Sequence, residues 1–189
     1  MENQEKSLAR DKLALLKSIS TLATQYDIVR LLKKITEVYG LRAFLVTRMP
    51  GATSHALQST SVISSWPADL MARYDQASLM GSSSVLAQLR ASTVPFTVDL
   101  TERAPAGTGG GRDVDVLALF TAYSMERFAV FPVANAEGER GAVSFYGDRP
   151  LPSEQEMLEL SMVSIHVFDR LYQIGRTGQK PGEGLTERE

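Results

Sequence analysis

The fold class is decided by the stretch FAVFPVANAEGERGAVSFY, residues 128–146. Residues 128–133 are continuously apolar, and residues 141–146 form a second run of strand-forming residues. Between them, Asn135 to Gly138 has the composition of a turn, so the two runs predict an antiparallel hairpin. Pro132 has no backbone N–H to donate, which predicts an edge strand or a bulge at that position.

Outward from this hairpin, segments with strand character alternate with segments of helical period. Further strands are expected at 42–49, at 95–100 and, more weakly, at 56–63; the expected helices are 7–22, 28–39, 68–76, 85–91, 113–123 and 154–174. Several strands are apolar on both faces, and a sheet buried on both sides needs helices on both sides. The sequence therefore predicts an α/β fold, a three-layer α/β/α sandwich with a central, mainly antiparallel sheet.

Two helix ends carry local signals. Gly40 follows the helical period of 28–39 and is expected to adopt the left-handed conformation that ends a helix. Ser153 and Glu156 have the spacing of a capping box, in which each side chain accepts a hydrogen bond from the other residue's backbone N–H. They predict the start of the longest helix.

The composition excludes several classes of protein. The chain has 189 residues, a formal charge of −2 and no cysteine, and 43% of its residues are hydrophobic. Such a chain is neither disordered nor collagen-like, and it offers no basic field for nucleic acid and no thiolate chemistry. The absence of cysteine is consistent with a reducing compartment, and we expect a cytoplasmic protein.

Catalytic and metal-binding patterns are weak. The two histidines, His55 and His166, fall in a turn region and inside the longest predicted helix, where neither has an evident catalytic partner. Asp113 and Asp115 open a predicted helix, where acidic residues favour the helix dipole, and the glycines of 107–111 lack the lysine of a phosphate loop. We expect no enzyme, no metal and no cofactor.

Three segments resemble the N-terminal autoinducer-binding domain of LuxR-type transcription regulators. The first block comprises WPADLMARY at 66–74, SSV at 83–85 and PFTV at 95–98; the second comprises Pro132, Gly138 and GAVS at 141–144. The closing LTERE of 185–189 is similar to the start of the LuxR-type helix-turn-helix and has the spacing of a capping box. The resemblance implies a regulatory domain at 1–175, a linker at 176–184 and, from 185, the first residues of a missing DNA-binding domain.

The departures from the family pattern fall on the positions that hold the signal. The family's Asp, which accepts from the amide of an acyl-homoserine lactone, is Ser83 here, and the Trp that donates to the lactone carbonyl is Leu70. A second Trp, which closes the pocket, is replaced by Val98. By family position the ligand-binding candidates are Trp66, Leu70, Tyr74, Ser83, Val98 and Ser144.

Losing the Asp and Trp contacts together weakens binding by roughly two to four kcal/mol, about 30- to 1000-fold. We therefore expect a regulatory and dimerisation domain that does not bind acyl-homoserine lactones in the usual way. Two alternatives stay open: a sensor of a different apolar or amphipathic molecule, and an enzyme acting on small acyl substrates.

The resemblance also implies a partner subunit. Degenerate domains of this kind occur in paired regulators such as VisN and VisR, so we expect a homodimer or a heterodimer with a related subunit. Met157, Leu160, Ile165 and Phe168 of the last predicted helix are expected to divide between the core and this partner. DNA would be contacted only through the absent C-terminal domain, and no membrane contact is expected.

Overall fold

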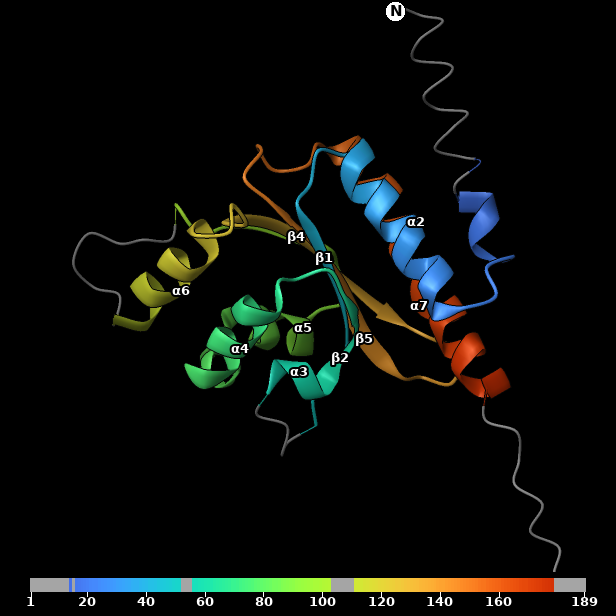
Figure 1. The fold of residues 1–189 in the computed structure, drawn as a ribbon, viewed down its shortest axis with the longest axis horizontal. Coiled ribbons are helices and arrows are strands. Elements are labelled where there is room, and N and C mark those ends of the chain that lie inside the picture. The colour runs from blue at the N-terminus through green and yellow to red at the C-terminus, as the bar shows by residue number, and fades with distance from the viewer. Residues whose placement is uncertain (1–13, 15, 52–55, 103–110, 179–189) are drawn as a thin grey trace, which may run out of the picture.

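Five strands form one sheet in the order β2-β1-β5-β4-β3, and every neighbouring pair is antiparallel. The structure is a computed structural model that describes residues 14, 16–51, 56–102 and 111–178 (Figure 1). The strands are β1 (Ala43–Arg48), β2 (Ser61–Ser64), β3 (Phe96–Asp99), β4 (Arg127–Ala134) and β5 (Arg140–Gly147).

Helices cover both faces of this sheet (Figure 1). On one face lie the two long helices, α2 (Gln25–Val38) and α7 (Glu154–Gly178). On the other lie α3 (Leu57–Thr60), α4 (Ala68–Gln76), the 3₁₀ turn η1 (Leu79–Ser82), α5 (Ser84–Ala91) and α6 (Gly111–Thr121). The predicted three-layer α/β/α sandwich with an antiparallel sheet is confirmed.

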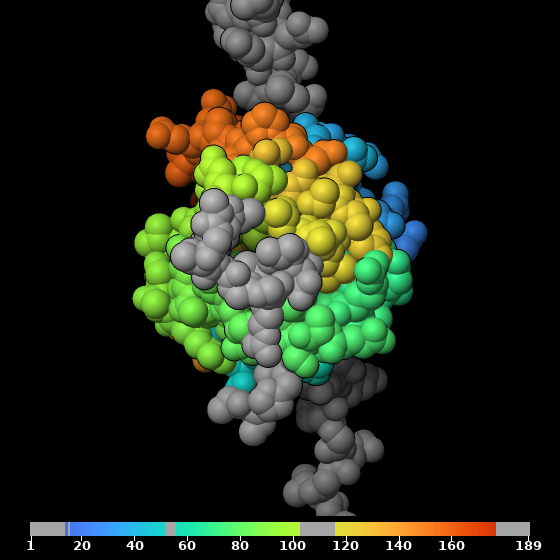
Figure 2. Space-filling model, turned by 90° about the vertical axis from the view of Figure 1, so that its left-hand side faces the viewer, coloured from blue at the N-terminus to red at the C-terminus, as the bar shows by residue number. Residues whose placement is uncertain are grey.

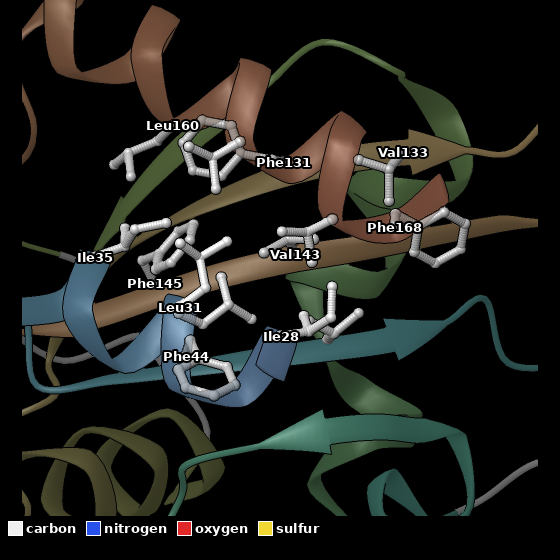
Figure 3. Packing of buried hydrophobic residues seen from close by; sticks show 14 of the residues in the cluster. Ile28, Leu31, Ile35, Phe44, Phe131, Val133, Val143, Phe145, Leu160 and Phe168 are labelled. Carbon is white, nitrogen blue, oxygen red and sulfur yellow. The ribbon is translucent and has the colours of Figure 1, made fainter. Parts of the chain in front are cut away.

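Alternation along the central strands sends side chains into two separate cores. In β1, Phe44 and Val46 pack beneath α2 and α7, whereas Ala43 and Leu45 face the shorter helices. Figure 3 shows the first core, in which Ile28, Leu31 and Ile35 of α2 meet phenylalanines of the sheet. Because each face of the strand has its own apolar partner, the sequence of β1 is apolar at successive positions.

Both long helices begin with a capping box. Glu156 N–H donates to Ser153 Oγ at 3.3 Å and Ser153 N–H donates to Glu156 Oε2 at 2.8 Å, which confirms the predicted start of α7. Thr24 and Asp27 make the same reciprocal pair at 3.1 and 3.0 Å, so α2 begins earlier than its apolar period predicts. Gly40 has φ +63°, as expected for the residue that ends α2.

The predicted hairpin is β4 and β5, with Phe128 opposite Tyr146 and Ala134 opposite Arg140. Its turn is held by the buried side chain of Asn135, whose Oδ1 accepts from the N–H groups of Glu137 and Glu139 at 3.1 and 2.9 Å. Asn135 Nδ2 also donates to Glu139 Oε2 at 3.2 Å.

The two glutamates of this turn form ion pairs in different directions. Glu139 Oε1 lies 3.1 Å from Arg48 Nε at the end of β1. Glu137 pairs with Arg176 in the last part of α7. The turn is therefore joined both to a central strand and to the end of the longest helix.

β4 lies between β5 and β3, but β3 pairs with it only as far as Val130. Among the described residues β4 has no paired neighbour on that side at Pro132, so the proline stands at a local edge, as predicted. There is no bulge, since the register with β5 continues without a shift through Pro132 and Ala142. Proline is tolerated at an edge, where its missing N–H costs the sheet no ladder hydrogen bond.

The weak strand predicted at 56–63 is wrong in its first half. Residues Leu57–Thr60 form α3, and only from Ser61 does the chain enter β2. The carboxylate of Asp75 accepts from the N–H groups of Leu57 and Gln58 at 2.6 and 3.1 Å. This cap from α4 satisfies the first orphan donors of a helix that has little local propensity.

α7 continues to Gly178, so the first residues of the predicted linker of 176–184 are helical. In the predicted first helix, residues 16–19 are helical and most of the remainder lies outside the described residues, as do His55, the glycines at 107–110, and 185–189. Among the described helices, none is both long and apolar enough to cross a bilayer.

Candidate functional site

A cavity of about 370 Å³ lies between the sheet and the shorter helices. Its floor is formed by β1, β4 and β5, and its walls by residues from α3 to α6. Figure 2 views the molecule from this side, where the green segments of α4 and α5 lie beside the yellow segment of α6. Volumes of this size are typical of pockets for small organic ligands.

Four of the six predicted ligand-binding residues line the cavity: Trp66, Tyr74, Ser83 and Ser144. Trp66 lies two residues before the start of α4, and its backbone N–H donates to Ser64 Oγ at 2.9 Å. Ser83 caps α5 by accepting from Leu86 N–H at 3.3 Å. Tyr74 comes from α4 and Ser144 from β5, so two helices, the residue before one of them and the sheet bring these groups together.

The other two predicted residues, Leu70 and Val98, do not line the cavity. Leu70 has no exposed surface and Val98 is 2% exposed, and both belong to the core on this side of the sheet. Both side chains are aliphatic and lie within the packed core behind the lining.

An aromatic cluster surrounds Trp66. Its ring makes edge-to-face contacts with Tyr146, Phe120 and Tyr74, at centroid distances of 5.1, 5.3 and 5.9 Å. Edge-to-face pairs of this kind stabilise a cluster beyond the area that they bury. The indole of Trp66 is therefore held in one orientation by three neighbours from α4, α6 and β5.

The indole N–H of Trp66 has no hydrogen-bond partner among the described residues, although Trp66 is only 8% exposed. A buried donor without an acceptor costs about 1–3 kcal/mol. The cavity beside it is where an acceptor could be supplied.

The polar lining is dominated by hydroxyl groups. Beside Ser83 and Ser144, the cavity is lined by Thr47, Thr60, Ser82, Ser84, Tyr74 and Tyr146, and no Asp, Glu, Asn, Gln, His or Lys contributes to its described wall. Arg48 is the one charged residue of that wall, and its side chain is 63% exposed and paired with Glu139.

Both tyrosines of the cavity stay protonated. Burial raises the pKa of Tyr146 far above its ordinary value, and interaction with the Ser144 side chain opposes that rise only in part. Burial likewise raises the pKa of Tyr74, against an opposing contribution from the Ser83 side chain. The environment of these phenols disfavours negative charge.

Several lining residues escaped the sequence analysis. Tyr146 lies two positions after Ser144 on the predicted strand, so strand alternation alone places it on the same face. Phe120 comes from α6 and carried no distinguishing local signal. Arg48 and Gly141 are opposite each other in the register of β1 and β5, which no local pattern reveals.

At Gly141 the sheet is closely approached from the side of α7. A Cβ built at this position would collide with the backbone oxygen of Thr47 and would lie 2.5 Å from Cε2 of Phe168 in α7. Only glycine lets the Phe168 ring approach the sheet so closely at a position that also lines the cavity.

Within the described residues, no three His, Cys, Asp or Glu side chains are grouped so that they could hold a metal ion. His166 is exposed on α7, on the opposite side of the sheet from the cavity, and has no part in it. The cavity thus offers shape and hydrogen bonds but neither a nucleophile with its base nor a metal centre.

The sequence model of the family described as "Autoinducer binding domain" matches residues 24–171. The chain belongs to the autoinducer-binding domain family. The match includes the whole sheet and every residue named above as lining the cavity. Domains of this family are the ligand-binding regulatory domains of LuxR-type transcription regulators in quorum sensing, and they are not enzymes, so the enzyme alternative is wrong.

Solved structures share the fold of this autoinducer-binding domain at low sequence identity. Escherichia coli SdiA is 12% identical with a TM-score of 0.64, covering 93% of this chain and 73% of that one. The LuxR-family factor CepR2 of Burkholderia cenocepacia, described as dependent on N-acylhomoserine lactone, is 12% identical with a TM-score of 0.58, covering 88% and 94%.

A GAF domain of a putative sensor histidine kinase from Pseudomonas syringae pv. tomato is 9% identical with a TM-score of 0.55, covering 94% of this chain and 96% of that one. The fold is therefore GAF-like as well. No curated protein matches the chain by sequence.

Proposed function

We propose that this autoinducer-binding domain senses a small amphipathic molecule other than the usual acyl-homoserine lactones. The observation that carries the proposal is the cavity of about 370 Å³, which is large enough for at least a dozen water-sized groups. A pocket that had become packed, as a purely structural dimerisation module requires, would have no such volume.

The replaced residues argue against the usual lactone. Ser83 stands where the family has the carboxylate that accepts from the amide, and its oxygen already accepts from Leu86 N–H. Leu70, at the position of the lactone-binding Trp, has no donor and lies outside the lining. Both losses leave polar atoms of a buried lactone without partners.

A neighbouring structure supports a wider ligand range. SdiA in complex with octanoyl-rac-glycerol is 13% identical to this chain with a TM-score of 0.61, covering 93% of it and 71% of that chain. In that fold, a medium-length acyl chain without a homoserine lactone is accommodated. The apolar walls here, which include Leu57, Leu79 and Leu89, suit a similar chain.

The test uses Trp66, the only tryptophan of the sequence, as a fluorescent reporter inside the cavity. N-acyl-homoserine lactones of graded chain length should give no saturable change in fluorescence or in titration calorimetry at sub-micromolar concentration. Native mass spectrometry of the purified protein should show a copurified small molecule. Sub-micromolar binding of any N-acyl-homoserine lactone contradicts the proposal.

A matched pair of variants sharpens this test. Ser83→Asp restores the family's acceptor and keeps a good N-cap, so lactone affinity should rise about tenfold, the equivalent of one charge-assisted hydrogen bond. Ser59→Asp, at an exposed position of α3 outside the cavity lining, is the control and should leave lactone affinity unchanged.

We propose that a partner subunit binds to an exposed apolar stripe on α7. Leu158, Met162 and Ile165 recur at helical spacing and are 71%, 47% and 47% exposed. Leu160 and Phe168 of the same helix are core residues, and Met157 is partly buried against the core. Light scattering should show a homodimer, and Met162→Lys should shift it toward the monomer. If the protein alone is monomeric, the heterodimer with a VisN- or VisR-like subunit is tested in the same way.

The remaining parts of the proposal rest on the resemblance. Residues 185–189 resemble the start of a LuxR-type helix-turn-helix, so we propose that the domain acts in the cytoplasm and that ligand and partner control DNA binding by a domain of that type. The protein extended by such a domain should bind DNA, whereas residues 1–175 alone should not.

A further inference from the structure

One wall of the cavity is biased toward hydrogen-bond donation. Its fixed point is the indole N–H of Trp66, which can only donate and which has no acceptor among the described residues. Trp66 lines the cavity, and only 8% of its surface is exposed. Its ring is held by the aromatic cluster. It cannot satisfy its donor by turning toward solvent.

The start of α5 brings the positive end of a helix dipole to the same wall, although Leu86 N–H already donates to Ser83 Oγ. Residues 82–86 all line the cavity, and α5 spans Ser84–Ala91, so the first turn of this helix borders the empty volume. The first N–H groups of a helix have no intrahelical acceptors and carry the positive end of its dipole. Interaction between Ser83 and Tyr74 places this turn beside the aromatic cluster.

No lining side chain in the described wall is an obligatory acceptor, because carboxylates and carboxamides are missing from it. A ligand group that must donate, such as a secondary amide N–H, therefore competes for hydroxyl oxygens. Ser83 Oγ, the oxygen at the family's acceptor position, is already engaged by the backbone of α5.

A full negative charge is also disfavoured at this wall. Tyr146, Ser144 and Trp66 are each less than 9% exposed, so an anion there would lose its hydration. The raised pKa values of both tyrosines show that the surroundings oppose an anion. Arg48, the one lining cation, is engaged by Glu139 and lies at the far end of β1, where the strand meets Gly141.

We propose that the ligand is a neutral acyl compound whose polar end carries carbonyl oxygens and no N–H, such as an ester, ketone or lactone, with one oxygen accepting from Trp66. This inference rests on the proposed function, since it requires that the cavity binds a small molecule. At Ser83, where the family has a carboxylate that accepts from an amide, this wall has only a hydroxyl that already accepts from Leu86 N–H, and the fixed polar group beside the cavity is the donor of Trp66.

Three probes of equal chain length isolate the polar end: methyl octanoate, N-methyloctanamide and octanoate. Binding is followed by Trp66 fluorescence and by titration calorimetry at pH 7. The ester should bind about tenfold more tightly than the amide, because the amide N–H is buried without an obligatory acceptor, and octanoate should bind more weakly than either.

Variants assign the contact. Trp66→Phe keeps an aromatic ring and removes the donor, so ester affinity measured by calorimetry should fall about tenfold while circular dichroism stays that of the parent. Tyr26→Phe, which removes a hydroxyl from an exposed residue of α2 outside the cavity lining, is the control and should leave ester affinity within about twofold. If Trp66→Phe fails to fold, the three probes on the parent protein still decide the question.

The two proposals fail differently. If the amide or octanoate binds as tightly as the ester, the cavity is a small-molecule site and the inference about its polar end is wrong. An unchanged ester affinity in a folded Trp66→Phe variant also overturns it. If no probe binds and mass spectrometry finds no copurified molecule, the proposed function itself is refuted, and this inference with it.

Discussion

Gly141 offers the sharpest test of how the two layers of helices meet the sheet. We expect Gly141→Ala to destabilise the domain strongly, because the added methyl group would contact the Thr47 backbone oxygen and the Phe168 ring well inside normal van der Waals distance, the ring carbons lying at 2.5 and 2.7 Å. The ring can turn aside, but the oxygen belongs to the ladder between β1 and β5 and cannot.

Overpacking of a core costs about 1–3 kcal/mol, and a backbone obstacle places this case near the upper end, at about 3 kcal/mol. For a domain of this size, each kcal/mol lowers the melting temperature by about 2–4 °C, so the expected loss is about 6–12 °C. The free energy of unfolding is measured by urea titration followed by Trp66 fluorescence, and the melting temperature by thermal unfolding followed by circular dichroism.

Gly175→Ala is the matched control. A Cβ at Gly175 meets nothing within 4 Å, and the residue lies within α7, where alanine favours the helix by about 0.5–1 kcal/mol. The control should be as stable as the parent or slightly more so. If Gly141→Ala is also within about 0.5 kcal/mol of the parent, the close approach of Phe168 to the sheet is refuted.

Three further predictions concern α7. Ser153→Ala removes the N-cap and should lower the free energy of unfolding by about 1 kcal/mol in urea titrations, with no change in ligand binding. Tyr39→Phe removes the hydroxyl that donates to Glu159 at 2.6 Å and should cost about 1.5 kcal/mol by the same method; an unchanged midpoint would show that this bond contributes nothing. Hydrogen bonding from Arg149 lowers the pKa of Glu156 below its ordinary value of 4.5. The ionised Glu156 therefore stabilises the folded state fully above pH 4.5, and this stabilisation is lost as the pH falls further. The urea midpoint should decrease below pH 4.5, and it should decrease less in Glu156→Gln.

The sheet and its layers could be predicted because the signals are local. The alternation and turn of residues 128–146 specify a hairpin, and the Ser153 capping box specifies the start of α7. α3 could not be predicted, since its first turn is capped by Asp75, which lies in the next helix. The three-dimensional partner, and not the local sequence, makes that segment helical.

The candidate site was reached only in part. The resemblance located Trp66 and Ser83, because the family motif fixes their places at the start of α4 and α5. The resemblance could not show that Leu70 lies in the core and not in the cavity lining, since its position depends on the packing of the core. Nor could it show the unpartnered donor of Trp66, because an absent hydrogen bond leaves no trace in a sequence.

The turn between β4 and β5 has one further consequence. A single amide, that of Asn135, holds the backbone from which Glu137 and Glu139 reach to Arg176 and Arg48. The ion pairs at the rim of the cavity and at the final turns of α7 therefore both depend on the hydrogen bonds of the Asn135 side chain. Damage to that amide loosens both ion pairs together, so separate defects at the two ends can share one origin.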